Sequence, residues 1–117
     1  MSGNGANAGG LADGDRGPVY AGRLEIRPAD HAALVDGRPL GLTLTELELL
    51  TVLSHNAERV MTREELLAAV WKRPYRKDDR SVDVYVGRLR MKLRRALPGS
   101  SFIHTHAGIG YRFSPVG

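Results

Sequence analysis

One amphipathic segment, residues 79–96, most constrains how this chain can fold. Four apolar residues recur there at spacings of four, three and four, namely Val82, Val86, Leu89 and Leu93. This spacing places them on one face of an α-helix. At about 100° per residue the opposite face collects Arg80, Val84, Arg88, Met91 and Arg95. The apolar stripe predicts packing against other elements, while the arginine-rich face stays open to solvent or to a ligand.

Positive charge is concentrated on the same part of the chain. Residues 71–95 carry ten Lys/Arg against three Asp/Glu, whereas residues 1–70 carry six against ten. Clustered cations on one element are the electrostatic signature of a nucleic-acid-binding surface, and each neutralised phosphate adds to affinity by releasing counterions. A solvated helix face without a ligand is the alternative that charge alone leaves open.

Length and composition exclude several classes of protein. The 117 residues allow one domain with its own core, and the absence of cysteine removes disulfides and thiolate metal ligands. The sequence contains neither an apolar run of the roughly 18 residues that a membrane span needs nor a secretory signal. We therefore expect a cytoplasmic protein without membrane contact. No nucleophile–base pair, metal-ligand set or phosphate loop stands out, so we expect no enzyme, cofactor, metal or small-molecule ligand.

The chain divides into a short N-terminal segment and one domain. Residues 1–18 are rich in Gly, Ala and Asn and lack an apolar period, which predicts a flexible linker or tail ahead of a domain over residues 19–117. Residues 19–42 alternate apolar runs with turn residues, and Asp36-Gly37 lies between two such runs. Because that dipeptide favours a hairpin turn, we expect a small antiparallel sheet here.

Three helices and a hairpin are expected after the sheet. The capping boxes Thr43–Glu46 and Thr62–Glu65 start the first two helices. The first runs to about His55 with Leu44 among its inward residues, and Pro74 ends the second and opens a basic loop. Asp78 or Asp79 can cap the third helix. The sequence then reads as a strand over residues 102–106, a turn over 107–110 and a strand over 111–113. This order predicts an α+β winged helix-turn-helix with an N-terminal antiparallel β-sheet and a C-terminal β-hairpin wing.

Four motifs of this chain resemble, in order and spacing, those of one family. They are Leu42-Thr43-x-Thr45-Glu46-x-x-Leu49-Leu50, Val60-x-x-Arg63-Glu64-x-Leu66-Leu67-x-x-Val70-Trp71, Asp79-Arg80-Ser81-Val82-Asp83-Val84 with Arg88-Leu89-Arg90, and Gly108-x-Gly110-Tyr111-Arg112-Phe113. Over residues 22–114 the chain therefore resembles the C-terminal DNA-binding domain of OmpR/PhoB-type response regulators. The resemblance implies a four-stranded N-terminal sheet and a recognition helix near residues 79–96 that enters the major groove.

The resemblance also implies roles for particular side chains. Arg88 corresponds to a position that reads bases. Positions on or near the phosphate backbone, or at the base of the wing, correspond to Trp71, Arg80, Tyr85, Arg90, Thr105 and Tyr111. From their places on the helix face and the wing, we add Val84, Met91, Lys92, Arg95 and His106 to the predicted DNA-binding residues. The loop over residues 72–79 matches a segment that contacts RNA polymerase, which points to Lys72, Arg73, Tyr75, Arg76 and Lys77; in the alternative, its cations add DNA contacts.

Two positions depart from the family pattern. Ala107 stands where family members usually carry an arginine that enters the minor groove, so we expect weaker minor-groove readout. Gly87 stands where many carry a basic residue, and glycine inside a helix costs roughly 1 kcal/mol relative to alanine. Gly87 either forfeits a side-chain contact or permits close approach of the helix backbone to DNA, and the sequence leaves both readings open.

The function implied by the resemblance is sequence-specific binding of double-stranded DNA by the effector domain of a bacterial two-component transcription regulator. Such domains pair on direct-repeat half-sites, which implies a homodimer on DNA. The chain has no room for a phosphoacceptor receiver domain, so we expect it to be the effector domain of such a regulator with residues 1–18 as the remnant linker; the alternative is a protein with a different upstream module. The competing class is a protein-interaction module that docks RNA polymerase or a sensory partner and has only non-specific DNA affinity.

Overall fold

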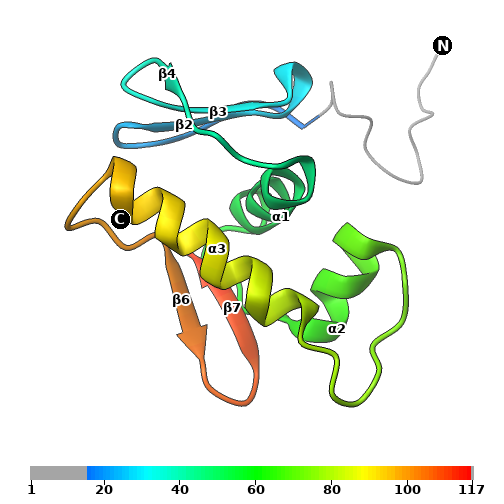
Figure 1. Cartoon of the computed structure of the whole chain (residues 1–117). Coiled ribbons are helices and arrows are strands. Elements are labelled where there is room, and N and C mark those ends of the chain that lie inside the picture. The colour runs from blue at the N-terminus through cyan, green and yellow to red at the C-terminus, as the bar shows by residue number, and fades with distance from the viewer. Residues whose placement is uncertain (1–15, 117) are drawn as a thin grey trace, which may run out of the picture.

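The N-terminal layer is a four-stranded antiparallel sheet (Figure 1), in a computed structural model that describes residues 16–116. Its strands lie in sequence order: β1 (Val19–Ala21), β2 (Leu24–Arg27), β3 (Ala32–Val35) and β4 (Arg38–Pro39). Asp36 and Gly37 form the turn between β3 and β4 with φ of 52° and 79°, the positive values that a two-residue hairpin turn favours. The predicted sheet and its hairpin are therefore confirmed. Residues 1–15 of the predicted linker lie outside the described part of the chain, and that prediction stays untested.

Both predicted capping boxes are formed. At the start of α1 (Leu44–His55), the Thr43 hydroxyl accepts a hydrogen bond from the Glu46 N–H (3.2 Å) while the Glu46 carboxylate accepts one from the Thr43 N–H (2.9 Å). Thr62 and Glu65 repeat this arrangement at the start of α2 (Arg63–Leu66). Because each box satisfies backbone donors that the first helical turn leaves unpaired, the two helices begin where the sequence predicted.

Three details of the helices differ from the sequence prediction. Leu44 is 75% exposed, because it is the first residue of α1 and the first turn buries Glu46 in its place. After α2 the chain continues as one π-helical turn (Leu67–Trp71) and stops at Lys72, whose left-handed backbone ends the helix before Pro74. Finally, α3 spans Ser81–Ala96 and begins two residues later than expected; its N-cap residue, Arg80, makes no side-chain cap, while the Asp79 carboxylate accepts from the Ser81 N–H at the first residue of the helix.

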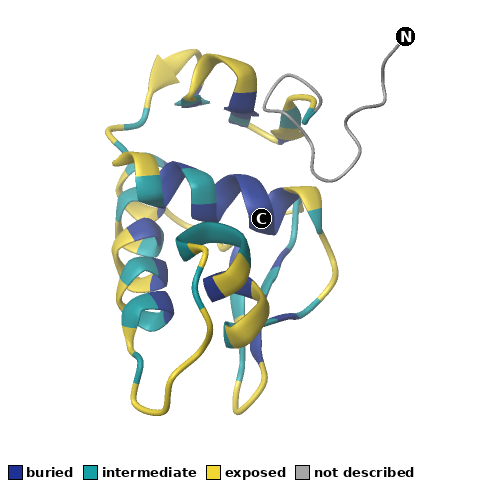
Figure 2. Cartoon of the chain, turned by 90° about the vertical axis from the view of Figure 1, so that its right-hand side faces the viewer, coloured by how far each residue is buried: buried dark blue, intermediate teal, exposed yellow. Residues whose placement is uncertain are grey.

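The core lies between the sheet and the three helices, and Figure 2 shows the helices turning their buried residues inward. Residues 49–54 of α1 are all buried, which makes α1 the central helix. The predicted apolar stripe of α3 is confirmed, since Val82, Val86, Leu89 and Leu93 are each at most 5% exposed. This stripe fixes which face of α3 remains at the surface.

The C-terminal hairpin belongs to a three-stranded sheet that the sequence did not predict. Strands β6 (Ile103–His106) and β7 (Gly110–Phe113) form the expected hairpin, and β7 also pairs with β5 (Met61–Thr62). A two-residue strand carries no readable period, which explains why β5 was missed. At Gly110 the strands come so close that a Cβ would lie 1.9 Å from the Met61 carbonyl oxygen.

We predict that Gly110→Ala strongly destabilises the domain, because the new methyl group overlaps the backbone of β5. The expected loss in the free energy of unfolding is at least about 2 kcal/mol, measured by urea denaturation. Gly41→Ala is the matched control: a Cβ there meets nothing within 4 Å, so its effect should stay within about 0.5 kcal/mol. Equal stabilities of the two variants would contradict the close pairing of β5 with β7.

Candidate nucleic-acid interface

The outer face of α3 is the surface that the sequence predicted. Val84 and Met91 are 45% and 52% exposed, and Arg80, Arg88 and Arg95 are exposed beside them. Sixteen residues of regular helix therefore present apolar and guanidinium groups together on a convex surface. An α-helix of this kind has the width of the DNA major groove.

Ion pairing leaves the positive charge on one part of the molecule. Elsewhere in residues 16–116 arginines are neutralised locally, for example Arg23 by Asp36, Arg59 by Glu65 and Arg112 by Glu58. Within the described chain, the cations without an Asp or Glu in ion-pair range are Arg38, Lys72, Arg76, Lys77, Arg80, Arg88, Arg90, Arg94 and Arg95. All but Arg38 lie between residues 72 and 95. The field of the domain is thus concentrated around α3 and the loop before it.

Arg88 rests on an aromatic support. Its guanidinium carbon lies 4.9 Å from the centroid of the Tyr85 ring, a cation–π distance. The Tyr85 ring in turn meets Trp71 edge to face, with 5.4 Å between centroids and 77° between planes. This chain of contacts runs from the end of α2 to the outer face of α3, and it restricts the directions in which Arg88 can point.

The wing is joined to the helices around Tyr111. Its hydroxyl donates to Asp83 (2.5 Å), which also accepts from Arg63 (2.9 Å), and the guanidinium carbons of Arg63 and Arg90 each lie 5.4 Å from the ring centroid. Burial, together with the hydrogen bond to Asp83, raises the pKa of the Tyr111 phenol. The sequence analysis did not predict that Arg63 would pair with Asp83 and lie over the Tyr111 ring. The available signal was a charged residue shortly before the apolar residues Leu66 and Leu67.

Arg90 fastens the wing strand to α3. Its side chain donates to the Ile103 carbonyl oxygen (3.2 Å) and to the Thr105 hydroxyl (2.6 Å). Burial lowers the pKa of the Arg90 guanidinium, and the like charge of Arg94 adds to that effect. Asp83, the acid in the first turn of α3, pairs with Arg63 and not with Arg90. Three predicted DNA contacts, Arg90, Thr105 and Tyr111, therefore lie together and touch one another.

Lys92 is turned into the protein. Its ammonium pairs with Glu46 (2.6 Å) and donates to the Gly41 carbonyl oxygen (2.9 Å). Glu46 is only 2% exposed. Burial raises the pKa of this carboxyl, but hydrogen bonds from Lys92 and Thr43 outweigh burial and hold the net pKa below its ordinary value. The sequence pattern grouped Lys92 with the DNA contacts, whereas the structure engages its ammonium internally because the i+3 position from Leu89 lies at the edge of the helix facing α1.

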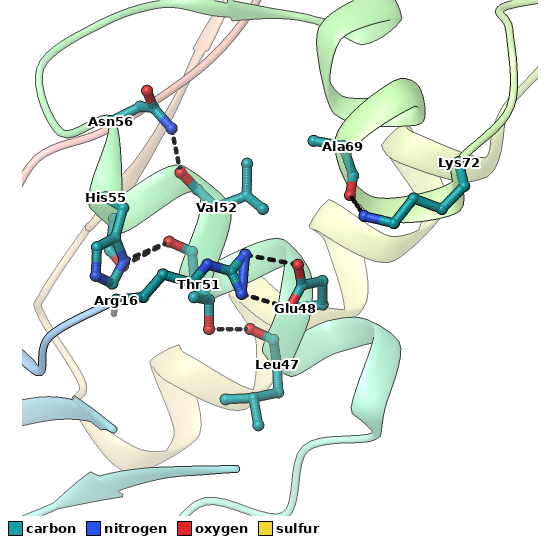
Figure 3. Close-up of polar contacts among 10 residues, drawn as sticks. Arg16, Leu47, Glu48, Thr51, Val52, His55, Asn56, Ala69 and Lys72 are labelled. Carbon is teal, nitrogen blue, oxygen red and sulfur yellow. Dashed lines mark hydrogen bonds and ion pairs between the residues drawn. The ribbon is translucent and has the colours of Figure 1, made fainter. Parts of the chain in front are cut away.

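The loop between α2 and α3 is braced at both ends. Arg73 pairs with Asp79 and donates to the Ser81 hydroxyl (2.8 Å), while Asp79 accepts from the Ser81 N–H (3.0 Å). The Arg73 guanidinium, followed by the Ser81 N–H, holds the pKa of Asp79 well below its usual range. At the other end Lys72 donates to the Ala69 carbonyl oxygen (2.6 Å; Figure 3). Tyr75, Arg76 and Lys77 remain exposed between these braces.

The tip of the wing is apolar. Ala107 and Ile109 are exposed, while His106 accepts a hydrogen bond from the Arg112 side chain (3.0 Å), which also pairs with Glu58. His106 is thus placed within the wing and not at its tip. In residues 16–116 no group of three or more acidic, His or Cys side chains could hold a metal ion, and no helix there has the length and apolarity to span a membrane.

Arg16 of the predicted linker lies against α1 (Figure 3). Arg16 makes two hydrogen bonds to Glu48 (3.1 and 2.7 Å), and the His55 ring contacts the carbonyl oxygens of Gly17 (2.8 Å) and Thr51 (3.0 Å). The chain therefore enters the domain along α1, and the outer face of α3 does not take part in these contacts.

The three helices, the braced loop and the wing define a winged helix-turn-helix domain with a cationic, solvent-exposed third helix. The family model described as "Transcriptional regulatory protein, C terminal" matches residues 37–113. The chain belongs to this family, the OmpR/PhoB-type DNA-binding domains of response regulators.

Relatives and solved structures agree with this assignment. The chain is 36% identical over 101 residues to the sensory transduction protein RegX3 of Mycolicibacterium smegmatis, covering 86% of this chain and 44% of that protein. It is 36% identical over 97 residues to the phosphate regulon regulatory protein PhoB of Pseudomonas aeruginosa, covering 83% and 42%. The chain thus spans less than half the length of these relatives.

Among solved structures, the DNA-binding domain of CpxR from E. coli superposes with a TM-score of 0.79 at 29% identity, covering 86% of this chain and 99% of that one. The Klebsiella pneumoniae RstA DNA-binding domain, solved in complex with the RstA box, gives a TM-score of 0.76 at 32% identity, covering 84% and 97%. The predicted fold class is therefore confirmed.

We predict that Lys92→Met destabilises the domain by about 2 kcal/mol at neutral pH, because it leaves the buried Glu46 carboxylate with one partner fewer. The depressed pKa of Glu46 means that the ion pair contributes above the unfolded-state pKa and that this contribution is lost as pH falls through the folded-state value. The deficit of the variant should therefore shrink in acid, as measured by denaturation at several pH values.

Arg95→Met is the control for this experiment, since it removes an exposed cation of the same helix that has no acidic partner within residues 16–116. Its stability should stay close to that of the unmodified protein at every pH. A Lys92→Met protein as stable as Arg95→Met would show that the ion pair with Glu46 contributes nothing.

Proposed function

We propose that this domain binds double-stranded DNA in a sequence-specific manner, as the effector part of a bacterial two-component transcription regulator. The observation that carries the proposal is the outer face of α3, where exposed arginines without acidic partners surround Val84 and Met91 on a helix anchored by a buried stripe. The relative PhoB is named a transcriptional regulatory protein and the relative RegX3 a sensory transduction protein, and the similar RstA domain was solved in complex with the RstA box. The domain acts by binding, and we assign it no catalytic step.

The proposed contacts follow from position and charge. Arg88, held over the Tyr85 ring, reaches a guanine edge in the major groove, where arginine makes a bidentate pair. Arg80 and Arg95, one turn or more away on the same face, contact phosphates. Arg90, Thr105 and Tyr111 place the wing beside α3, so that the wing strand follows the backbone while its apolar tip adds little minor-groove readout.

Further partners are proposed for the loop between α2 and α3. Tyr75, Arg76 and Lys77 are exposed on a segment whose two ends are braced, which suits a docking surface for RNA polymerase near the bound promoter. Pairing of two copies on direct-repeat half-sites and location in the cytoplasm, where bacterial DNA lies, complete the proposal.

A module that docks only onto proteins is the competing proposal, supported by the apolar wing tip and by Gly87. Titration with random-sequence duplex separates the two, because cations that neutralise phosphates give an affinity that falls steeply with salt concentration. Salt-independent affinity, or none, would favour the docking module.

The test of the function is selection of binding sites from a random duplex pool at about 150 mM salt, an ionic strength at which specific affinity still exceeds non-specific affinity by about 1,000-fold or more. We expect one enriched motif, repeated at helical-turn spacing if two copies pair. Arg88→Ala should lower affinity for that motif by about 1–3 kcal/mol and relax selection at one base pair. An unchanged motif and affinity would refute the placement of α3 in the major groove.

Arg80→Ala should act differently, since a phosphate contact carries no sequence information. We expect affinity for motif and random duplex to fall together, and the slope of log K against log salt to decrease by about one. Arg38→Ala is the matched control, because Arg38 is an exposed cation without an acidic partner in residues 16–116 and belongs to β4 of the N-terminal sheet, not to α3. A variant at Arg80 that matched the Arg38 variant in salt slope would count against the phosphate contact.

A further inference from the structure

Gly87 lies on the surface of α3, and neither backbone nor packing calls for glycine there. It lies in the middle of a 16-residue helix, it is not among the glycines with positive φ, and it is exposed. A Cβ added to it would meet no atom within 4 Å, the nearby backbone of its own helix aside. Since glycine weakens a helix relative to alanine, the reason for it must be sought in what the helix touches.

Two of the four residues that neighbour Gly87 on the helix surface are apolar, and the other two, Asp83 and Arg90, are engaged by Arg63 and Tyr111 and by the wing strand. Val84 precedes it by three residues and Met91 follows it by four, so both are its neighbours on the helix surface, and both are about half exposed. Arg80 and Arg95 lie one turn beyond Val84 and Met91. We call Val84, Gly87 and Met91 the α3 notch: a short apolar strip with a missing side chain at its centre, bounded by cations. It spans about 10 Å along the helix axis.

We propose that the α3 notch reads thymine through its C5 methyl group, beside the base that Arg88 contacts. The thymine methyl is the apolar group that base pairs present in the major groove, and it fits a surface that offers no hydrogen-bond donor or acceptor. The absent Cβ at Gly87 lets the helix backbone approach this methyl group closely. This inference rests on the proposed function and adds the class of sequence that the domain reads.

The test compares selection from two random duplex pools that are identical except that deoxyuridine replaces every thymidine in one of them. Uracil keeps the pairing edge and O4 of thymine and lacks only the methyl group. We expect thymine at fixed positions of the motif from the first pool, and weaker binding of the matching uracil duplex by about fourfold for each contacted methyl.

Two variants refine the test. Gly87→Ala should melt several degrees higher, because alanine favours the helix, yet it should bind the motif more weakly and lose most of its discrimination between thymine and uracil. Arg94→Ala changes an exposed residue of the same helix beyond the notch and should keep that discrimination. The expected gain in stability separates a binding defect of Gly87→Ala from misfolding.

The outcomes distinguish this inference from the function on which it rests. The same motif with equal affinity from both pools overturns the reading of the methyl group and leaves sequence-specific binding standing. Full discrimination in Gly87→Ala overturns the role of the missing Cβ. No motif from either pool overturns the proposed function, and the inference with it.

Discussion

The position of α3 depends on one buried carboxylate. Glu46 accepts the Thr43 N–H that closes the capping box of α1, and the same carboxylate oxygen, Oε1, accepts from Lys92. A carboxylate so fully removed from water is costly without such partners, so the start of α1 and the middle of α3 are held at one separation. The apolar stripe of α3 decides which face turns inward. The bonds of Lys92 to Glu46 and Gly41, with those of Arg90 to the wing, help to hold α3 in place, and with it the residues of the outer face.

The distribution of ion pairs decides where the domain can attract a polyanion. Asp36, Glu58 and Glu65 each lie beside an arginine of the sheet, the turn after α1 or the wing, and these pairs are partly exposed, so they add little stability. Their main effect is on the electrostatic field of the domain, because each carboxylate offsets the positive charge of an arginine outside α3. Arg80, Arg88 and Arg95 have no acidic partner within residues 16–116, and a net charge of only +4 still produces a concentrated positive surface.

The sequence predicted the elements whose signals are local or periodic. The two capping boxes, the Asp36-Gly37 turn and the stripe of α3 each depend on a few neighbouring residues, and each was found where predicted. Two other features, strand β5 and the exposure of Leu44, depend on how separate elements pack together and could not be predicted from neighbouring residues. Strand β5 is too short for a period, and Leu44 matched the apolar pattern of α1 but lies before the point where the helix reaches the core.

Side-chain partners were the least predictable part of the site. Position on a helical wheel correctly placed Arg88 and Met91 on the outer face, since exposure depends on α3 alone. It could not find the partners of Lys92 or Arg90, because Glu46 lies 46 residues away in the chain and Thr105 lies 15 residues away. Arg63 was overlooked for the same reason, as its importance appears only when Asp83 and Tyr111 are brought to it from two other elements.

The contacts of the wing bear on how such a domain can read DNA without an arginine at its tip. Arg90 is half-buried and shares its donors between the Ile103 carbonyl and the Thr105 hydroxyl, and Tyr111 lies between two guanidinium groups. Side chains held in this way lose little conformational entropy when a ligand arrives. Their contribution is to fix the angle between wing and α3 before DNA is met. In the proposed mode of binding, Ala107 at the tip leaves base readout to the outer face of α3, where we propose that the missing Cβ at Gly87 sets how closely the helix approaches a base pair.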